Sequence, residues 1–216
     1  MTSKILACET LRDELEYAIE ITGKAYEVVW LESGLHNYPD KLRAQMQGAL
    51  DTFVNCDQVL MAFGCCGNSV IGLKTGDYQL IIPRVDDCIS LLVGSVKKRM
   101  TYEKTYFLTR GWLRGERNLW VEYKYSVDKF GEEMADMLME SMLRNYKFLG
   151  ILDTKCYGIN EIMPEITRIT RALKLNRIII PASVEYLLDL LSGPWGKERF
   201  ITVPKNSVVV DFRLFD

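Results

Sequence analysis

The chain has 216 residues, of which 48% are hydrophobic and 26% charged, so it can bury a sizeable core and is not intrinsically disordered. Its 27 basic and 29 acidic side chains leave a net charge of −2, which argues against a nucleic-acid partner. No apolar run reaches the roughly 18 residues of a membrane-spanning helix, and the one near the N-terminus is too short for a signal peptide. We therefore expect a cytoplasmic protein with no membrane partner.

Predicted strands and helices alternate along the first half of the chain. Short apolar and β-branched runs are typical of buried strands, whereas apolar residues three or four positions apart are typical of helices. The predicted strands are 4–8, 26–31, 58–64 and 79–83, and the predicted helices are 9–22, one from Pro39 onward, and one capped by Asp86 or Asp87.

The second half repeats this alternation after a Trp-rich stretch over 111–125. The predicted strands are 104–109, 147–153, 177–181 and 200–204, and the predicted helices are 129–146, 161–173 and one that follows Ser183. In the helix 129–146 the inward-facing side chains are expected to be Phe130, Met134, Met137, Leu138 and Met142.

Strands that alternate with helices predict an α/β fold with a doubly wound, Rossmann-like and mainly parallel sheet. We expect a single domain over residues 1–216. If it divides into sub-lobes 1–98 and 99–216, the seam falls near 95–125 and a cleft lies at the carboxyl ends of the strands. Asp153, Tyr157 and Asn160 follow a second-half strand and could close that cleft from the other side, although a helix cap is favoured for Asn160.

Four residues with metal-binding side chains follow four consecutive strands. Cys8 ends the first strand, His36 follows the second, Cys66 the third and Cys88 the fourth. The carboxyl ends of parallel strands emerge along one edge of a sheet, where ligands bind. Three sulfurs and the only imidazole of the chain would suit a tetrahedral zinc site. Cys88 is also expected in the first turn of a helix, where the helix dipole favours a thiolate.

Other interpretations of these residues stay open. Each cysteine taken alone is more often a packed core residue, and a lone histidine in a turn is more often solvated. Cys56 and Cys156 are assigned to packing. A site without chemistry would make the protein a small-molecule binding or accessory module, and an iron–sulfur cluster is a third alternative, with ligands Cys8, Cys65, Cys66 and Cys88.

A second set of residues is expected to bind substrate near the metal. Gly67 and Asn68 belong to a glycine-rich turn that could form an anion-binding nest. Arg84 lies close to Asp87 in the sequence and could clamp a carboxylate or phosphate group.

Several segments together resemble a known family. They are ACE at 7–9, LHN at 35–37, FGCCGN at 63–68, IPRVDDCI at 82–89, LTRGW at 108–112 and LLSGPW at 190–195. The chain resembles the domain of unknown function 1638 family over nearly its whole length, most specifically in the stretch 83–88. In that family's pattern the cysteine before Gly-Asn matches Cys66, and Cys65 stands where an apolar residue is usual.

The resemblance implies a biological context rather than a catalytic assignment. Family members occur in methanogenic archaea and anaerobic bacteria, often near corrinoid-dependent methyltransferases. This context implies a zinc-binding protein that acts in or alongside corrinoid-linked methyl transfer and one-carbon metabolism, as a zinc-dependent methyltransferase or an accessory factor to one. Its partners would be a small-molecule substrate or corrinoid methyltransferase proteins.

Overall fold

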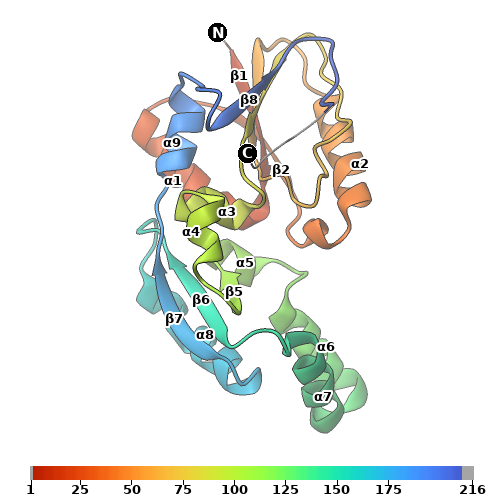
Figure 1. Ribbon diagram of the computed structural model, residues 1–216, viewed down its shortest axis with the longest axis vertical. Helices are drawn as coiled ribbons and strands as arrows, with labels where there is room; N and C mark the ends of the chain where they lie inside the picture. Colours follow the sequence, from red (N-terminus) through yellow and green to blue (C-terminus); the bar gives the residue numbers. More distant parts are fainter. Residues whose placement is uncertain (1, 211–216) are drawn as a thin grey trace.

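The computed structural model describes residues 2–210, which form two lobes that each contain a sheet (Figure 1). The first lobe holds a five-stranded sheet in the order β2-β1-β3-β4-β8, in which β1 to β4 are parallel and β8 is antiparallel to β4. Its strands are β1 (Ser3–Cys8), β2 (Glu27–Leu31), β3 (Gln58–Ala62), β4 (Gln79–Pro83) and β8 (Phe200–Val203). The predicted mainly parallel, Rossmann-like α/β fold is confirmed.

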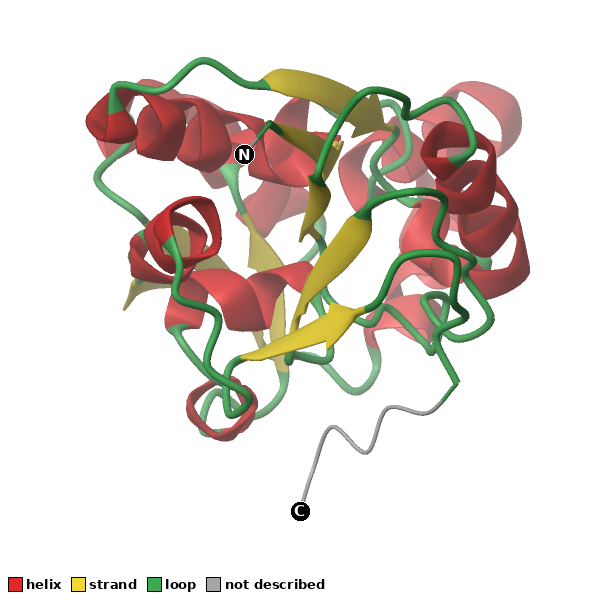
Figure 2. Cartoon of the chain, turned by 90° about the horizontal axis from the view of Figure 1, so that it is seen from above, coloured by secondary structure: helices red, strands yellow, loops and turns green. Residues whose placement is uncertain are grey.

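Helices cover both faces of this first sheet, as Figure 2 shows from above. Successive residues of a strand point to opposite faces, so Leu6 packs on one side of β1 and Ile5 on the other. The Leu6 face lies under α2 (Pro39–Leu50). The Ile5 face lies under α1 (Arg12–Thr22), α3 (Cys88–Val93) and α9 (Glu185–Ser192).

The second lobe is built on a three-stranded parallel sheet in the order β5-β6-β7. One face packs against α8, where Ile162, Ile166 and Ile169 are buried, and α6 and α7 complete the same apolar cluster. The elements of this lobe are β5 (Thr105–Leu108), α5 (Arg110–Arg114), α6 (Leu119–Phe130), α7 (Glu132–Leu143), β6 (Phe148–Asp153), α8 (Ile159–Ala172) and β7 (Asn176–Pro181).

The chain crosses between the lobes twice. The short helix α4 (Val96–Met100) leads from the first lobe into β5, and the chain returns after β7 to form α9 and β8. The sheet of the first lobe therefore contains strands from both sides of position 98, where the sequence suggested a division. Figure 1 shows the returning chain in blue, with β8 at the edge of the first sheet where it pairs with β4.

The predicted single helix 129–146 is wrong, because the chain forms two helices that meet at Gly131. This glycine has a φ of +83°, a backbone conformation that ends a regular helix. The inward face also differs from the expectation: Met134, Met137 and Met142 are exposed by 48%, 60% and 54%.

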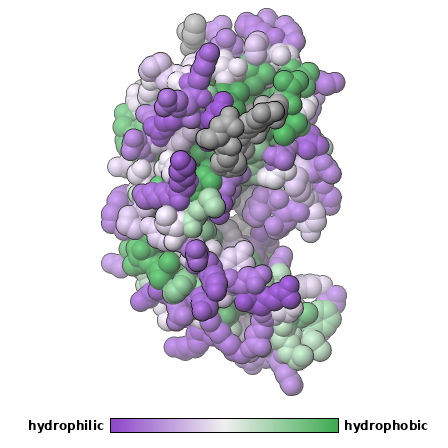
Figure 3. All heavy atoms as spheres, in the orientation of Figure 1, coloured by the Kyte–Doolittle hydropathy of each residue, from purple (hydrophilic) through white to green (hydrophobic). Residues whose placement is uncertain are grey.

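The reason is that α7 carries two neighbouring apolar stripes, and the lobe's core covers only the stripe of Ala135, Met139 and Leu143. Figure 3 shows apolar atoms at the surface of the lower right, over this helix pair. None of the helices within residues 2–210, this pair included, is long and apolar enough to cross a membrane.

Glycines bring the two lobes into close contact. A Cβ at Gly111 would overlap the carbonyl of Thr10, and one at Gly34 would stand 2.7 Å from the Cβ of Arg117. Thr109 Oγ1 donates a hydrogen bond of 3.0 Å to the same Thr10 carbonyl. The helix α5 and the residues that follow it are thereby packed directly on the segments that follow β1 and β2.

Candidate functional site

The strand order places the four predicted metal ligands along one edge of the first sheet. Cys8 ends β1, His36 lies in the short 3₁₀ helix η2 (Leu35–Asn37) after β2, Cys66 follows β3, and Cys88 begins α3 after β4. The loops after β1 and β3 leave toward opposite faces of the sheet, which is the position where open α/β sheets bind ligands. All four side chains line one cleft of about 920 Å³ between the lobes.

Main-chain contacts beyond the ends of β3 and β4 bring Cys66 and Cys88 together. The amide of Cys66 donates a 2.7 Å hydrogen bond to the carbonyl of Asp86, which continues the pairing of the two strands. Gly64 lies so close to Asp87 that a Cβ there would overlap the Asp87 backbone. As a result, the Cys88 thiol interacts with the thiols of both Cys66 and Cys8.

The cluster favours protonated thiols. Hydrogen bonding with Cys88, followed by burial, raises the pKa of Cys8 well above its ordinary value. The pKa of Cys88 is also raised well above its ordinary value, mainly by its hydrogen bond with Cys66 and by burial. Cys88 is the first residue of α3, as expected, but burial and the neighbouring Cys66 act against the thiolate that the helix dipole favours. The six residues of α3 supply a small dipole, and adjacent buried sulfurs resist gaining negative charge together.

His36 faces the same cleft from an exposed turn. Desolvation lowers its pKa, against the opposing effect of the Asp87 charge, so the imidazole is neutral at pH 7. Neutral imidazole is the form that ligates metals. Within residues 2–210, no group of three or more His, Cys, Asp or Glu side chains has the arrangement of a metal-ion site. The Cys8 thiol instead donates a 3.3 Å hydrogen bond to Thr10 Oγ1.

The remaining cysteines lie outside the cleft lining. Cys65 is buried, its thiol donates to Asn68 Oδ1 at 3.5 Å, and burial raises its pKa. Cys56 and Cys156 are half-buried at the margins of two different apolar clusters. Adjacent cysteines in the chain thus have different surroundings, and only Cys66 of the pair reaches the cleft.

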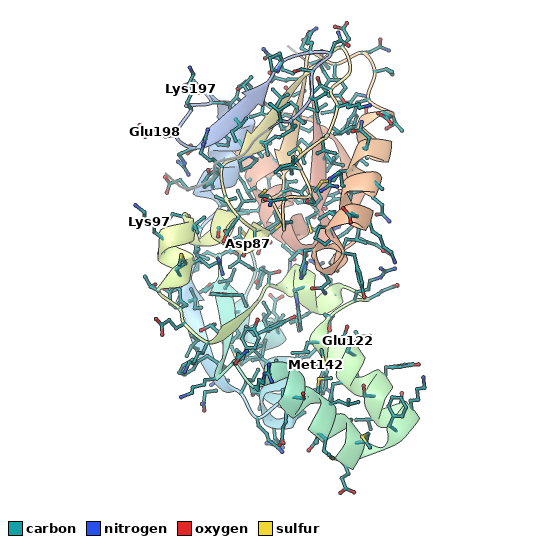
Figure 4. The ribbon with its side chains drawn as sticks, turned by 45° about the vertical axis from the view of Figure 1, so that its right-hand side comes forward. Asp87, Lys97, Glu122, Met142, Lys197 and Glu198 are labelled. Carbon is teal, nitrogen blue, oxygen red and sulfur yellow. The ribbon has the colours of Figure 1, made fainter. Side chains whose placement is uncertain are left out.

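The predicted substrate-binding residues separate into two groups. Gly67 and Asp87 line the cleft, whereas Asn68 and Arg84 do not. The Arg84 amide donates a 2.7 Å hydrogen bond to the carbonyl of Arg199, on the side of β8. Figure 4 shows Asp87 at the lower edge of the first lobe, facing the second lobe.

A different arginine, Arg99 of α4, lies in the cleft beside the acidic pair. Its Nη2 is 2.6 Å from Asp86 Oδ2 and its Nε is 3.4 Å from Asp87 Oδ2. Asp87 also caps α3, because its Oδ1 accepts a 2.8 Å hydrogen bond from the Ser90 amide. Sequence reasoning missed Arg99, and the basic run 97–99 was its only signal.

The opposite wall of the cleft, on the second lobe, is aromatic. It includes Tyr106 of β5, Trp112 of α5 and Tyr146, which follows α7. Figure 3 shows the outline of the molecule indented between the two lobes. The sequence pointed to Trp112 only as part of a Trp-rich stretch, since the partners of this ring come from two other elements.

The carboxyl ends of the second sheet do not open into this cleft. Asp153, Tyr157 and Asn160 are absent from its lining, so the suggestion that they close it from the other side is wrong. Tyr157 instead accepts a hydrogen bond from the Arg110 amide and donates one to the Leu152 carbonyl. This end of the sheet is packed against α1 of the first lobe.

Two acidic residues of α1 are buried in that contact. Asp13 pairs with Arg110 and Arg114, and these hydrogen bonds lower its pKa although burial acts in the other direction. Glu14 is fully buried, accepts a 3.1 Å hydrogen bond from Thr154 Oγ1, and has no partner for Oε2. Burial raises the pKa of Glu14 to about 7.

Comparison with known proteins adds one relationship. No curated protein and no solved structure matches the sequence. Residues 30–191, about three quarters of the chain, match the model of the family described as "Protein of unknown function (DUF1638)". The matched range includes His36, Cys66 and Cys88 and both walls of the cleft, and it begins after Cys8. The chain therefore belongs to the DUF1638 family of proteins of unknown function.

Proposed function

We propose that this protein binds a zinc ion through Cys8, Cys66 and Cys88, with His36 as the fourth ligand. The observation that supports the proposal is that all four side chains line one cleft at the carboxyl edge of the first sheet. Sulfur and imidazole donors in this number suit zinc better than magnesium or calcium, which prefer oxygen.

The protonated thiols define what metal binding would require. Zinc ligates thiolates, so Cys8 and Cys88 would release the protons that their raised pKa values favour. Positive charge at this point would relieve the repulsion that keeps the sulfurs neutral. His36 is already neutral and would need no such change.

The position of the site at a cleft favours a role in reaction over a purely structural one. If a substrate thiol took the place of His36, the zinc would keep three protein ligands and would hold that thiol as a reactive thiolate. Gly67, Asp87 and Arg99 would contact the rest of a small-molecule substrate, since all three line the cleft. In the context that the family resemblance implies, the protein would act in or alongside corrinoid-linked methyl transfer.

Elemental analysis of anaerobically purified protein tests the metal directly. We expect about one zinc per chain, and loss of most of it in Cys88→Ser and in Cys8→Ser. Cys156→Ser is the matched control, because Cys156 lies outside the cleft and should leave zinc unchanged. Iron with acid-labile sulfide would favour the iron–sulfur alternative. A wild-type protein without metal after zinc reconstitution would refute the proposal and leave a non-catalytic binding module.

Cobalt substitution tests the ligand set without any assay of activity. Thiolate-to-cobalt charge-transfer absorption should fall stepwise when Cys8, Cys66 and Cys88 are replaced singly by serine. His36→Ala should keep the charge-transfer bands and alter the ligand-field bands, since it removes no sulfur. Unchanged spectra in the cysteine variants would exclude these residues as ligands.

A further inference from the structure

The aromatic wall of the cleft forms a corner rather than a flat surface. The ring centroid of Tyr106 lies 5.6 Å from that of Trp112 and 5.6 Å from that of Tyr146, with an angle of 72° between the planes in both pairs. Elsewhere in the same lobe Trp120 and Tyr123 are stacked at 12°. Stacked rings present one flat face, whereas rings at steep angles surround a compact group from more than one side.

The charges around this corner are mainly negative. Figure 4 shows Glu122 on α6, in the second lobe; burial and, to a smaller extent, the charge of Glu122 raise the pKa of Tyr106 to about 12. Of the two basic side chains that line the cleft, Arg99 and Lys104, the first is engaged by Asp86 and Asp87. The acidic side chains in the lining are Glu32, Asp86, Asp87 and Glu103, of which Glu32 pairs with Arg117 at 3.5 Å.

We infer that the corner of Tyr106, Trp112 and Tyr146 binds an alkylated ammonium group of a small-molecule ligand. The faces of Tyr and Trp rings attract cations at centroid distances up to about 6 Å. An N-methylated ammonium is favoured over a primary one because it is more weakly hydrated and is transferred more easily to an aromatic surface.

The size of the cleft allows the rest of such a ligand to be accommodated. About 920 Å³ lies within the range of small-molecule sites, and one ammonium group occupies a small part of it. The inference does not depend on the proposed zinc site, because no thiol takes part in the aromatic corner.

Calorimetric titration with choline and with 3,3-dimethylbutan-1-ol tests the charge requirement. The alcohol has the shape of choline with a neutral carbon in place of nitrogen, so burial of its methyl groups is matched. We expect choline to bind at least about tenfold more tightly, which corresponds to about 1.4 kcal/mol. Equal affinities, or no choline binding tighter than about 10 mM, would overturn the inference.

Substitutions at Tyr146 test the location. This side chain is 39% exposed, so its truncation should leave the fold intact, which circular dichroism can verify. We expect Tyr146→Ala to weaken choline binding at least about fivefold and Tyr146→Phe to keep most of it, because the ring carries the interaction. The matched control is Tyr125→Ala on α6, an exposed tyrosine outside the cleft, which should not change the affinity.

One further variant separates this inference from the proposed function. Cys88→Ser should lose zinc and still bind choline with unchanged affinity. Choline binding that persists in Tyr146→Ala and disappears in Cys88→Ser would place the ammonium at the thiols and refute the aromatic site. A wild-type protein that binds choline but no zinc would refute the metal proposal alone.

Discussion

The carboxyl ends of the parallel strands lie in different surroundings in the two sheets. The first sheet ends at the cleft, where Cys8, Cys66 and Cys88 meet. The second sheet ends against α1, where Asp13 and Glu14 fill the space with buried ion pairs and hydrogen bonds. The carboxyl end of a parallel sheet becomes a binding site only where no other element covers it.

The largest expected effect concerns the covered end, which is the carboxyl end of the second sheet packed against α1. Asp13→Ala leaves Arg110 and Arg114 without their shared carboxylate, which is only 5% exposed, and we expect a loss of about 3–4 kcal/mol in the free energy of unfolding. Urea denaturation at pH 7 measures it. Glu161→Ala removes the exposed partner of Arg110 and should cost under about 1 kcal/mol. Similar losses in both variants would contradict the importance of burial here.

Gly64→Ala should disturb the carboxyl end of the first sheet, which faces the cleft. Its new methyl group would overlap the Asp87 backbone and push α3, with Cys88, away from the other thiols. We expect a destabilisation of about 3 kcal/mol in thermal or urea unfolding, together with reduced zinc binding. Gly48→Ala, in the interior of α2 with no atom within 4 Å of the new Cβ, should instead stabilise by up to about 1 kcal/mol. A well-folded Gly64→Ala protein with normal zinc content would argue against the close packing.

Glu14, at the carboxyl end of the second sheet that α1 covers, should make the stability of the protein depend on pH. Between its ordinary pKa of 4.5 and its folded pKa of about 7, the folded chain keeps a proton that the unfolded chain has released. Stability from this group is therefore full below pH 4.5, falls as the pH rises, and reaches its lowest value above pH 7.

Glu14→Gln stays neutral and escapes this penalty. We expect it to be more stable than the wild type by about 2–3 kcal/mol at pH 8, with a gap that closes toward pH 4.5. Denaturation curves at several pH values give the comparison. A gap that does not change with pH would show that Glu14 titrates normally.

The smallest expected effect is at Cys156, the cysteine near the covered end. Burial raises its pKa to about 11, and its thiol lies 3.6 Å from the Thr154 carbonyl. Cys156→Ser should change stability by less than about 1 kcal/mol. Alkylation followed by mass spectrometry should show that zinc protects Cys88 and leaves the labelling of Cys156 unchanged. Equal protection of both thiols would contradict zinc binding confined to the cleft.

Local sequence patterns were sufficient for most of the first lobe. The strand 79–83 has the predicted bounds, and 4–8 differs from β1 by one residue, since buried parallel strands appear as short apolar runs between turns. Alternation with helices indicated parallel strands, whose carboxyl ends share one edge of the sheet, and Cys8, Cys66 and Cys88 lie at that edge. Their mutual contacts were the part of the site that sequence spacing could anticipate.

Features that depend on contacts between distant elements could not be predicted. Met134 and Met137 belong to an apolar stripe that resembles a core face in sequence, yet no described element covers it. The aromatic corner joins a strand, a helix and a loop, and the covered end of the second sheet depends on how the lobes pack. Local spacing drew attention to Arg84 as the arginine near the acidic pair. The structure places Arg99, from a different helix, beside Asp86 and Asp87.

The return of the chain to form β8 has a consequence for biosynthesis. The partner of β4 lies about 120 positions later in the chain, so the edge of β4 stays unpaired until Phe200–Val203 has emerged from the ribosome. Such long-range pairing slows folding, and an uncovered apolar edge strand invites association with other chains. We expect nascent chains that stop before position 200 to need chaperones, and the second lobe to fold before the first is complete.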